Sequence, residues 1–154
     1  ILMTNRPDKL DVDIKRPGRL DRKIPFFYVD TAADRLRIVG AILRRNGAAL
    51  PEGEDAALTA ALEPLDGYSN ADLEAIALLA MDTARNDGAA LGLAHLQQAI
   101  ADFIPPQHTD TIQLMELLAA QESSRRSLLP ERFARLAPAE VSELIGELKR
   151  RLRQ

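Results

Sequence analysis

Residues 67–84, GYSNADLEAIALLAMDTA, contain both the start signal and the apolar face of one amphipathic helix. Ser69 stands at an N-cap position and Asp72 follows three residues later, which is the spacing of a capping box. Apolar side chains then recur at intervals that place them on one side of a helix: Leu73, Ile76, Ala77, Ala80 and Ala84. The Asp87-Gly88 pair supplies a stop signal. The stretch therefore predicts a buried helix and favours a mainly α fold.

Upstream of this stretch, two further helical patterns are present. Thr31 can cap a helix that we expect to end before Asn46-Gly47, because glycine readily closes a helix. A short helix is predicted over 54–62, after the turn formed by Pro51 and the two residues that follow it.

Downstream, a helix over 93–103 should stop at Pro105-Pro106. Another is expected to open at Thr109 or Asp110, and Pro138 should start the last one. The last helix carries an apolar stripe: Val141, Leu144, Ile145, Leu148 and Leu152. Two destinations for this stripe stay open: packing on the chain's own helices over 34–103, or a contact with another subunit.

The first 30 residues have a different, shorter pattern. Ile1–Thr4 and Lys23–Val29 are the two predicted strands, separated by turn-forming prolines. Three apolar residues followed by a polar pair resemble a buried strand that ends at a functional edge, and such a start indicates a fragment of a longer protein.

The composition limits the classes of protein to which the chain can belong. Apolar residues make up 46% of it, aromatic residues 4%, and the formal net charge is −3. Electrostatics therefore argue against nucleic-acid binding. The chain has no cysteine, which excludes disulfides and thiolate metal sites, and no apolar run reaches the roughly 18 residues of a membrane span. His95 and His108 lack ligand-spaced partners, so we interpret both as ordinary helix or loop residues.

Three segments carry residue types suited to chemistry, although each has a simpler explanation. In TNRPDKLD (4–11), the Asn5 amide could hold a water or a phosphate oxygen, or could form an Asx-turn. In RPGRLDR (16–22), the Pro-Gly turn carries Arg16 and Arg19, which suit a transferring phosphoryl group or are solvated surface residues. In GYSNADL (67–73), small residues at a helix start would let a ligand approach, or they form a cap.

Taken together, in this order and spacing, the three segments resemble the AAA-type ATPase family of the AAA+ superfamily, over residues 1 to about 106. The resemblance implies that Asn5 is the sensor-1 residue, which places the hydrolytic water. It implies that Arg16 and Arg19 are arginine fingers that reach the ATP of an adjacent subunit. It also implies that the lid segment near adenine and ribose contains Gly67, Asn70 and Ala71.

The family resemblance implies a domain plan as well. Residues 1–30 would be a remnant, with two short strands, of a parallel α/β nucleotide-binding sheet. Residues 31–106 would form the four-helix lid, ending near Ile104-Pro105-Pro106, and residues 107–154 a helical C-terminal extension without an assigned role.

The chain departs from the family pattern at several points. It contains no phosphate loop and no apolar strand ending in paired acids, so the main ligands of ATP phosphates and Mg²⁺ would lie outside it. Asn70 stands where the family usually has glycine, which weakens the expected backbone approach to the base. The first turn of the Ser69 helix has no arginine, as is usual for this clade.

The implied activity is ATP hydrolysis in a cytoplasmic homo-oligomeric ring, expected to be a hexamer, that remodels or unfolds protein partners. The chain alone should be inactive, and we expect no metal ligands, nucleic acid or membrane span in it. The alternative is a non-catalytic helical module that serves only protein interaction or oligomerisation.

Overall fold

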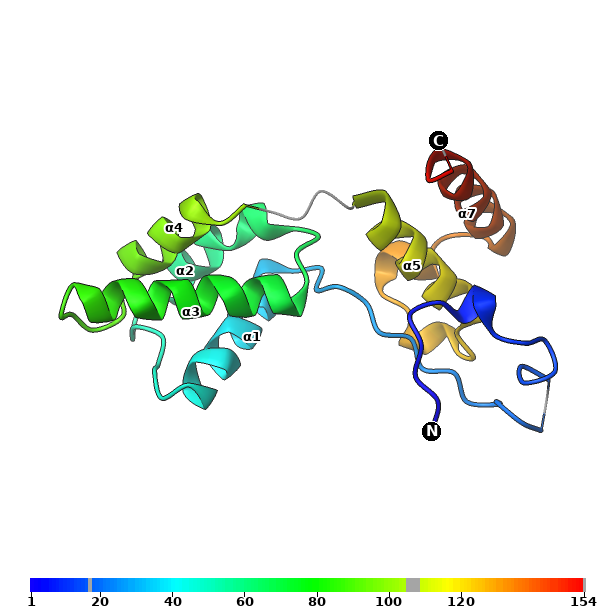
Figure 1. The fold of residues 1–154 in the computed structure, drawn as a ribbon, viewed down its shortest axis with the longest axis horizontal. Coiled ribbons are helices and arrows are strands. Elements are labelled where there is room, and N and C mark those ends of the chain that lie inside the picture. The colour runs from blue at the N-terminus through cyan, green and yellow to red at the C-terminus, as the bar shows by residue number, and fades with distance from the viewer. Residues whose placement is uncertain (17, 105–108, 154) are drawn as a thin grey trace. The chain divides into compact units, whose positions relative to one another are not determined.

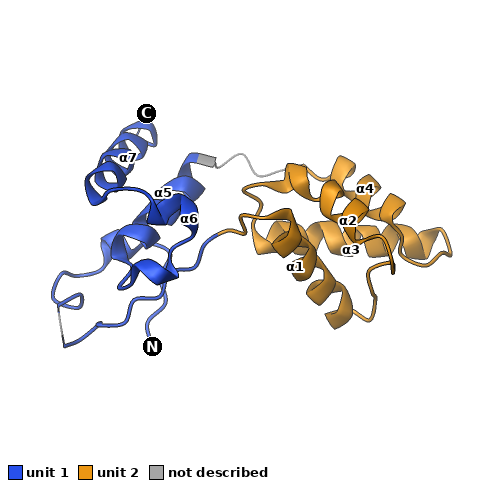
Figure 2. Ribbon diagram, turned by 180° about the vertical axis from the view of Figure 1, so that it is seen from behind, with its two compact units in different colours: residues 1–27, 107–154 blue, residues 28–106 orange. Residues whose placement is uncertain are grey.

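The computed structural model describes residues 1–16, 18–104 and 109–153 of the chain. It divides into two compact units, which Figure 2 colours separately. One consists of residues 28–106, and the other joins residues 1–27 with 107–154. The first 27 residues thus share a unit with the C-terminal segment. The division into a core remnant (1–30), a lid (31–106) and an extension (107–154) stays a prediction.

Residues 28–106 form a helical unit around an aliphatic core. Its helices are α1 (Ala32–Arg45), α2 (Asp55–Ala61), the short 3-10 helix η2 (Glu63–Leu65), α3 (Asn70–Asn86) and α4 (Leu93–Asp102), labelled in Figure 1 apart from η2. The fully buried side chains come from each of the first four elements, and α4 adds further core residues. Among them are Val39, Leu43, Leu58, Leu65, Leu73, Ile76 and Ala80. The face predicted for the Ser69 helix is therefore the buried face of α3.

The helix ends of this unit follow their local signals. The Thr31 hydroxyl accepts the Asp34 N–H at 3.1 Å and caps α1, as predicted. At the other end of α1, the Ala48 N–H donates to Leu43 O at 2.9 Å, and Gly47 has a φ of +79°. Both boundaries confirm the predicted start and stop. Each depends on residues within about one turn of the helix end, so the local sequence contains the signal.

The other unit contains η1 (Pro7–Lys9), α5 (Thr109–Glu122), η3 (Arg126–Leu128), α6 (Glu131–Ala134) and α7 (Pro138–Arg151) (Figure 1). The start of α7 at Pro138 confirms the prediction. α5 and α7 pack together around a second core, made of Leu114, Leu117, Leu118, Ala120, Phe133, Val141, Ile145 and Leu148. Phe27 stacks on Phe133 with ring centroids 5.1 Å apart and so attaches the N-terminal segment to this core.

The apolar stripe of α7 is mostly buried, but its partner differs from the one expected. Val141, Ile145 and Leu148 are buried, whereas Leu152 is 44% exposed near the end of the helix. Burial within the chain is therefore correct, while packing on the helices over 34–103 was the wrong partner. The amphipathic pattern marks the face that is buried and carries no information on which helix covers it.

The two predicted strands are absent from the described residues, so this part of the predicted fold class was wrong. Residues 1–4 and 23–29 belong to no sheet, and Ile1, Met3 and Phe26 are largely exposed. A strand needs a neighbour for its backbone N–H and C=O groups, and these segments have none. Lys23 pairs its backbone with Ser124 instead. The mainly α class is confirmed.

Prolines 105 and 106, predicted to end the helix over 93–103, and His108 lie outside the described residues, as does Pro17. No helix in the described ranges is both long and apolar enough to cross a bilayer.

Candidate functional site

The turn that carries the two candidate arginine fingers is closed by backbone and side-chain hydrogen bonds. The Arg19 N–H donates to Arg16 O at 3.2 Å, and Gly18 has a φ of +87°, which L side chains rarely adopt. The Gly18 N–H donates to the Asp21 carboxylate at 2.6 Å. Glycine at this position therefore permits the tight turn that the sequence indicated.

Both arginine side chains contact the same residue, Asp13. Arg16 Nη2 lies 2.8 Å from Asp13 Oδ1, and Arg19 Nη1 donates to Asp13 O at 3.1 Å. The Arg16 side chain is 67% exposed. An exposed ion pair such as that of Arg16 contributes little, about 0–1 kcal/mol. The contact of Arg19 is a single exposed hydrogen bond, so both guanidinium groups can leave Asp13 for a stronger anionic partner.

The segment around Asn5 is organised by its neighbours. The Arg6 N–H donates to Thr4 Oγ1 at 3.0 Å, so Thr4 rather than Asn5 forms the polar turn proposed as the simpler explanation. The Asn5 side chain is exposed and makes no hydrogen bond with any described residue. Its amide is therefore available to a ligand.

Asp8 is the most strongly perturbed acid in this unit. Arg6 binds it through two hydrogen bonds, both 2.9 Å, and Lys149 Nζ lies 3.7 Å away. The hydrogen bonds from Arg6 lower the pKa of Asp8 to about 2. Partial burial opposes this shift, and the positive charges of Arg6 and Lys149 support it. The ion pair with Lys149 attaches Asp8 of η1, three residues beyond Asn5, to α7.

The third candidate segment forms the start of α3. The Ser69 hydroxyl accepts the Asp72 N–H at 3.1 Å, and the Asp72 carboxylate accepts the Ser69 N–H at 2.8 Å. The predicted capping box is thus present. Gly67, Asn70 and Ala71 are exposed beside it, and the first N–H groups of a helix have no partner within the helix. The segment can therefore form the helix cap and still leave the start of α3 open to a ligand.

The six candidate residues fall into two groups. Asn5, Arg16 and Arg19 belong to the unit of residues 1–27 and 107–154, whereas Gly67, Asn70 and Ala71 belong to residues 28–106. In neither unit do the described residues include a cluster of three or more His, Cys, Asp or Glu side chains that could hold a metal ion.

Sequence reasoning missed a role for His95. Its Nδ1 accepts the Gly92 N–H at 3.0 Å and so completes the start of α4, while its Nε2 lies 3.5 Å from the Asp87 carboxylate. A histidine three residues after a helix start was the only available signal for this interaction.

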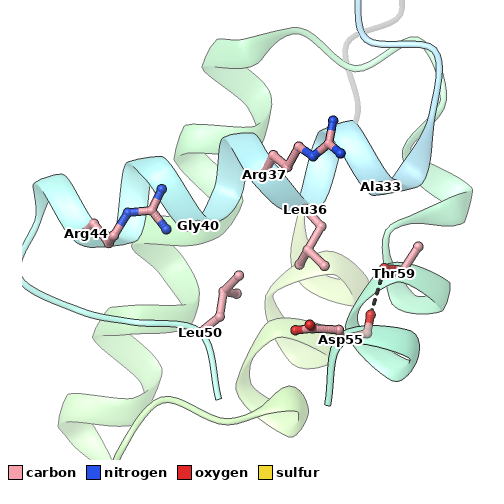
Figure 3. A pocket seen from close by; sticks show the side chains of 8 residues that line it. All are labelled: Ala33, Leu36, Arg37, Gly40, Arg44, Leu50, Asp55 and Thr59. Carbon is pink, nitrogen blue, oxygen red and sulfur yellow. Dashed lines mark hydrogen bonds between the residues drawn. The ribbon is translucent and has the colours of Figure 1, made fainter. Parts of the chain in front are cut away.

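A groove of about 380 Å³ lies between α1, α2 and the segment that joins them (Figure 3). Its lining mixes apolar, cationic and polar side chains: Ala33, Leu36, Arg37, Gly40, Arg44, Leu50, Asp55 and Thr59. A Cβ at Gly40 would lie 3.0 Å from Leu50 Cδ1, so a larger residue there would press on the leucine side chain that lines the groove. None of the candidate residues Gly67, Asn70 and Ala71 lines this groove.

Sequence reasoning also missed the contacts that flank the arginine turn. Lys15 and Lys23 stand on either side of it, and both donate to the carboxylate of Glu122 at the end of α5. Their spacing from Glu122 exceeds 90 residues, so no local pattern could have indicated the pairing.

Comparisons with known proteins give related sequences but no matching family model and no matching solved structure. The chain is 38% identical over 101 residues to the ATP-dependent zinc metalloprotease FtsH of Mycobacterium bovis, covering 65% of this chain and 13% of that protein. The FtsH of Rhodococcus erythropolis is 39% identical over 101 residues, 65% of this chain and 11% of the relative. Both relatives are ATP-dependent by name, and the similarity is confined to a part of each of them.

A further relative lies outside the FtsH group. Protein SAV of Sulfolobus acidocaldarius is 42% identical over 76 residues, which is 49% of this chain and 9% of that protein. The chain therefore spans only a small part of each of these relatives.

Proposed function

We propose that this chain is the C-terminal part of an AAA-type ATPase module, which hydrolyses ATP in a ring oligomer, expected to be a hexamer, and unfolds or remodels protein partners. The observation that carries the proposal is the ordered set TNRPDKLD, RPGRLDR and GYSNADL. Similarity to FtsH proteins, which are ATP-dependent by name, supports it as well. A protease that acts on folded chains requires them to be unfolded first, and this favours the unfolding role.

Each residue of the first unit has a distinct task in this proposal. The exposed Asn5 amide orients the attacking water against the γ-phosphate. Arg16 and Arg19 leave Asp13 and bind the phosphoryl oxygens of ATP in the neighbouring subunit. Planar guanidinium groups suit this task, because negative charge spreads over several oxygens in the transition state.

The second unit contacts the nucleoside. Gly67, Asn70 and Ala71 lie near adenine and ribose, where the exposed start of α3 allows close backbone approach. Magnesium and the phosphate chain need a phosphate loop and paired acids, which this sequence does not contain. The chain's own residues therefore fit only part of an ATP site.

The test replaces Arg16 or Arg19 with alanine in the protein that carries the complete module. Turnover should fall by about 10³-fold, because a finger acts on the transition state, while nucleotide binding stays nearly unchanged. The matched control is Arg85→Ala, since Arg85 is an exposed arginine in a surface pair with Asp82. Loss of ATP binding in the Arg16 and Arg19 variants, or unchanged turnover, would contradict the finger role. Absence of turnover in the original protein would favour the non-catalytic interaction module.

A further inference from the structure

The arginine turn is held at both ends by one carboxylate. Lys15 precedes Arg16 and donates to Glu122 Oε1 at 2.5 Å. Lys23 follows Arg22 and donates to Glu122 Oε2 at 2.8 Å. The two oxygens of a single side chain therefore close the segment that carries Arg16 and Arg19 into a short loop.

Backbone contacts with Ser124 reinforce one end of this loop. The Ser124 N–H and hydroxyl both donate to Lys23 O, at 3.3 and 3.1 Å, and the Lys23 N–H donates to Ser124 Oγ at 3.3 Å. Both the side chain and the backbone of Lys23 are thus attached to the end of α5 and the residues just beyond it.

The pairs with Glu122 are shielded from water more than ordinary surface pairs. The exposed fractions of the side chains are 20% for Lys15, 31% for Lys23 and 24% for Glu122. Burial raises the pKa of Glu122, but hydrogen bonds and positive charge from the two lysines lower it by more, so the carboxylate stays ionised. A partly buried ion pair is screened less by solvent and salt than an exposed one.

Bringing the two ends of a flexible loop together has an entropic cost. Once Glu122 holds both ends, the residues between them have fewer accessible conformations. The Arg16 side chain itself remains largely exposed, and its charged partner is the exposed Asp13. The attachment to Glu122 therefore holds the chain on either side of the turn and leaves the guanidinium group accessible.

We propose that Glu122 and Ser124 are positioning residues for the arginine turn, so that the C-terminal segment sets the geometry with which Arg16 and Arg19 reach a neighbouring subunit. This inference rests on the proposed function of the two arginines. It assigns residues 107–154, which the family resemblance leaves without a role, to the presentation of the fingers.

The first experiment needs no ATPase activity and uses the 154-residue chain. Trypsin cleavage after Arg19 is followed by mass spectrometry, and cleavage after Arg45, in the other unit, serves as the internal reference. In Glu122→Gln the Arg19 site should be cleaved about tenfold faster, which corresponds to about 1.4 kcal/mol in the opening equilibrium. The Arg45 rate should not change. The matched control is Glu131→Gln, whose exposed carboxylate pairs only with Arg135 among the described residues.

A charge exchange separates positioning from general stabilisation. The triple variant Lys15→Glu, Lys23→Glu and Glu122→Lys keeps the opposite charges in place and should return cleavage after Arg19 to within about threefold of the original rate. An unchanged Arg19 rate in Glu122→Gln would overturn the proposal. Equal acceleration at Arg19 and Arg45 would overturn it too, because the loss would then be global.

The second experiment measures ATP turnover in the protein with the complete module. Glu122→Gln should lower kcat about tenfold with KM for ATP unchanged, and the charge-exchanged triple variant should recover most of it. If Arg16→Ala abolishes turnover but Glu122→Gln does not alter it, the positioning role fails while the proposed function stands. If Arg16→Ala itself has no effect on turnover, the proposed finger role of Arg16 fails, and the cleavage result still decides whether Glu122 holds the turn.

Discussion

Replacing Arg35 with methionine should destabilise the unit of residues 28–106 by about 3 kcal/mol. Arg35 is only 3% exposed, although it lies in the first turn of α1. Its guanidinium donates to the carbonyl oxygens of Leu62 at 2.9 Å, Glu63 at 3.2 Å and Val29 at 3.1 Å. It therefore joins the end of α2 to the chain that enters α1.

The magnitude follows from these three hydrogen bonds. Each hydrogen bond from a charged donor contributes about 1.5 kcal/mol or more, and removing the donor leaves buried carbonyl oxygens unpaired. Methionine keeps most of the apolar stem and removes a charge whose burial is costly, so part of the loss is offset. The ion pair with Asp66 adds little, because it is 3.6 Å long and the Asp66 side chain is 80% exposed.

Tyrosine fluorescence during urea unfolding is the appropriate assay. The chain has two tyrosines, Tyr28 and Tyr68, and no tryptophan, and both tyrosines belong to residues 28–106. The fluorescence signal therefore comes from residues of this unit. Arg37→Met is the matched control, since that side chain is 81% exposed and should change the free energy of unfolding by less than about 0.5 kcal/mol. A loss below about 1 kcal/mol in Arg35→Met would refute the reasoning.

The remaining predictions concern the other unit and ATP. Gly146→Ala should raise the free energy of unfolding by about 0.5–1 kcal/mol, measured by urea unfolding with circular dichroism, because Gly146 lies inside α7 and a Cβ would only contact Arg150 Nη1 at an ordinary 3.8 Å. Ionised Asp8 stabilises the fold above its unfolded pKa of about 4, and this contribution is lost as pH falls towards the folded pKa of about 2. Asp8→Asn should therefore be less stable than the original chain at pH 6 and equally stable near pH 2. In calorimetry, the 154-residue chain should show no micromolar ATP binding and no turnover, since it has no phosphate loop.

Features with local causes could be predicted from the sequence. The starts of α1, α3 and α7 depend on Thr31, Ser69 and Pro138, whose capping geometry or fixed φ acts within one turn. The buried face of α3 followed from the sequence periodicity, because residues three or four positions apart lie on the same side of a helix.

Features that depend on distant residues could not be predicted. The expected strands would need neighbouring strands that the described residues do not supply, and the partner of α7 proved to be α5. The attachment of Lys15 and Lys23 to Glu122 joins residues 107 and 99 positions apart. The burial of Arg35 likewise depends on carbonyl groups of Leu62 and Glu63, which no helical pattern in α1 reveals.

The most direct test of the central claim mixes two inactive variants of the protein with the complete module. One is Arg16→Ala, and the other carries a disabled phosphate loop with Arg16 intact. If Arg16 acts on a neighbour's ATP, random mixing in equal amounts should restore about a quarter of the original turnover, because that share of the subunit contacts joins an intact phosphate loop to an intact finger. Absence of any recovery, in mixtures shown to form joint oligomers, would contradict the account.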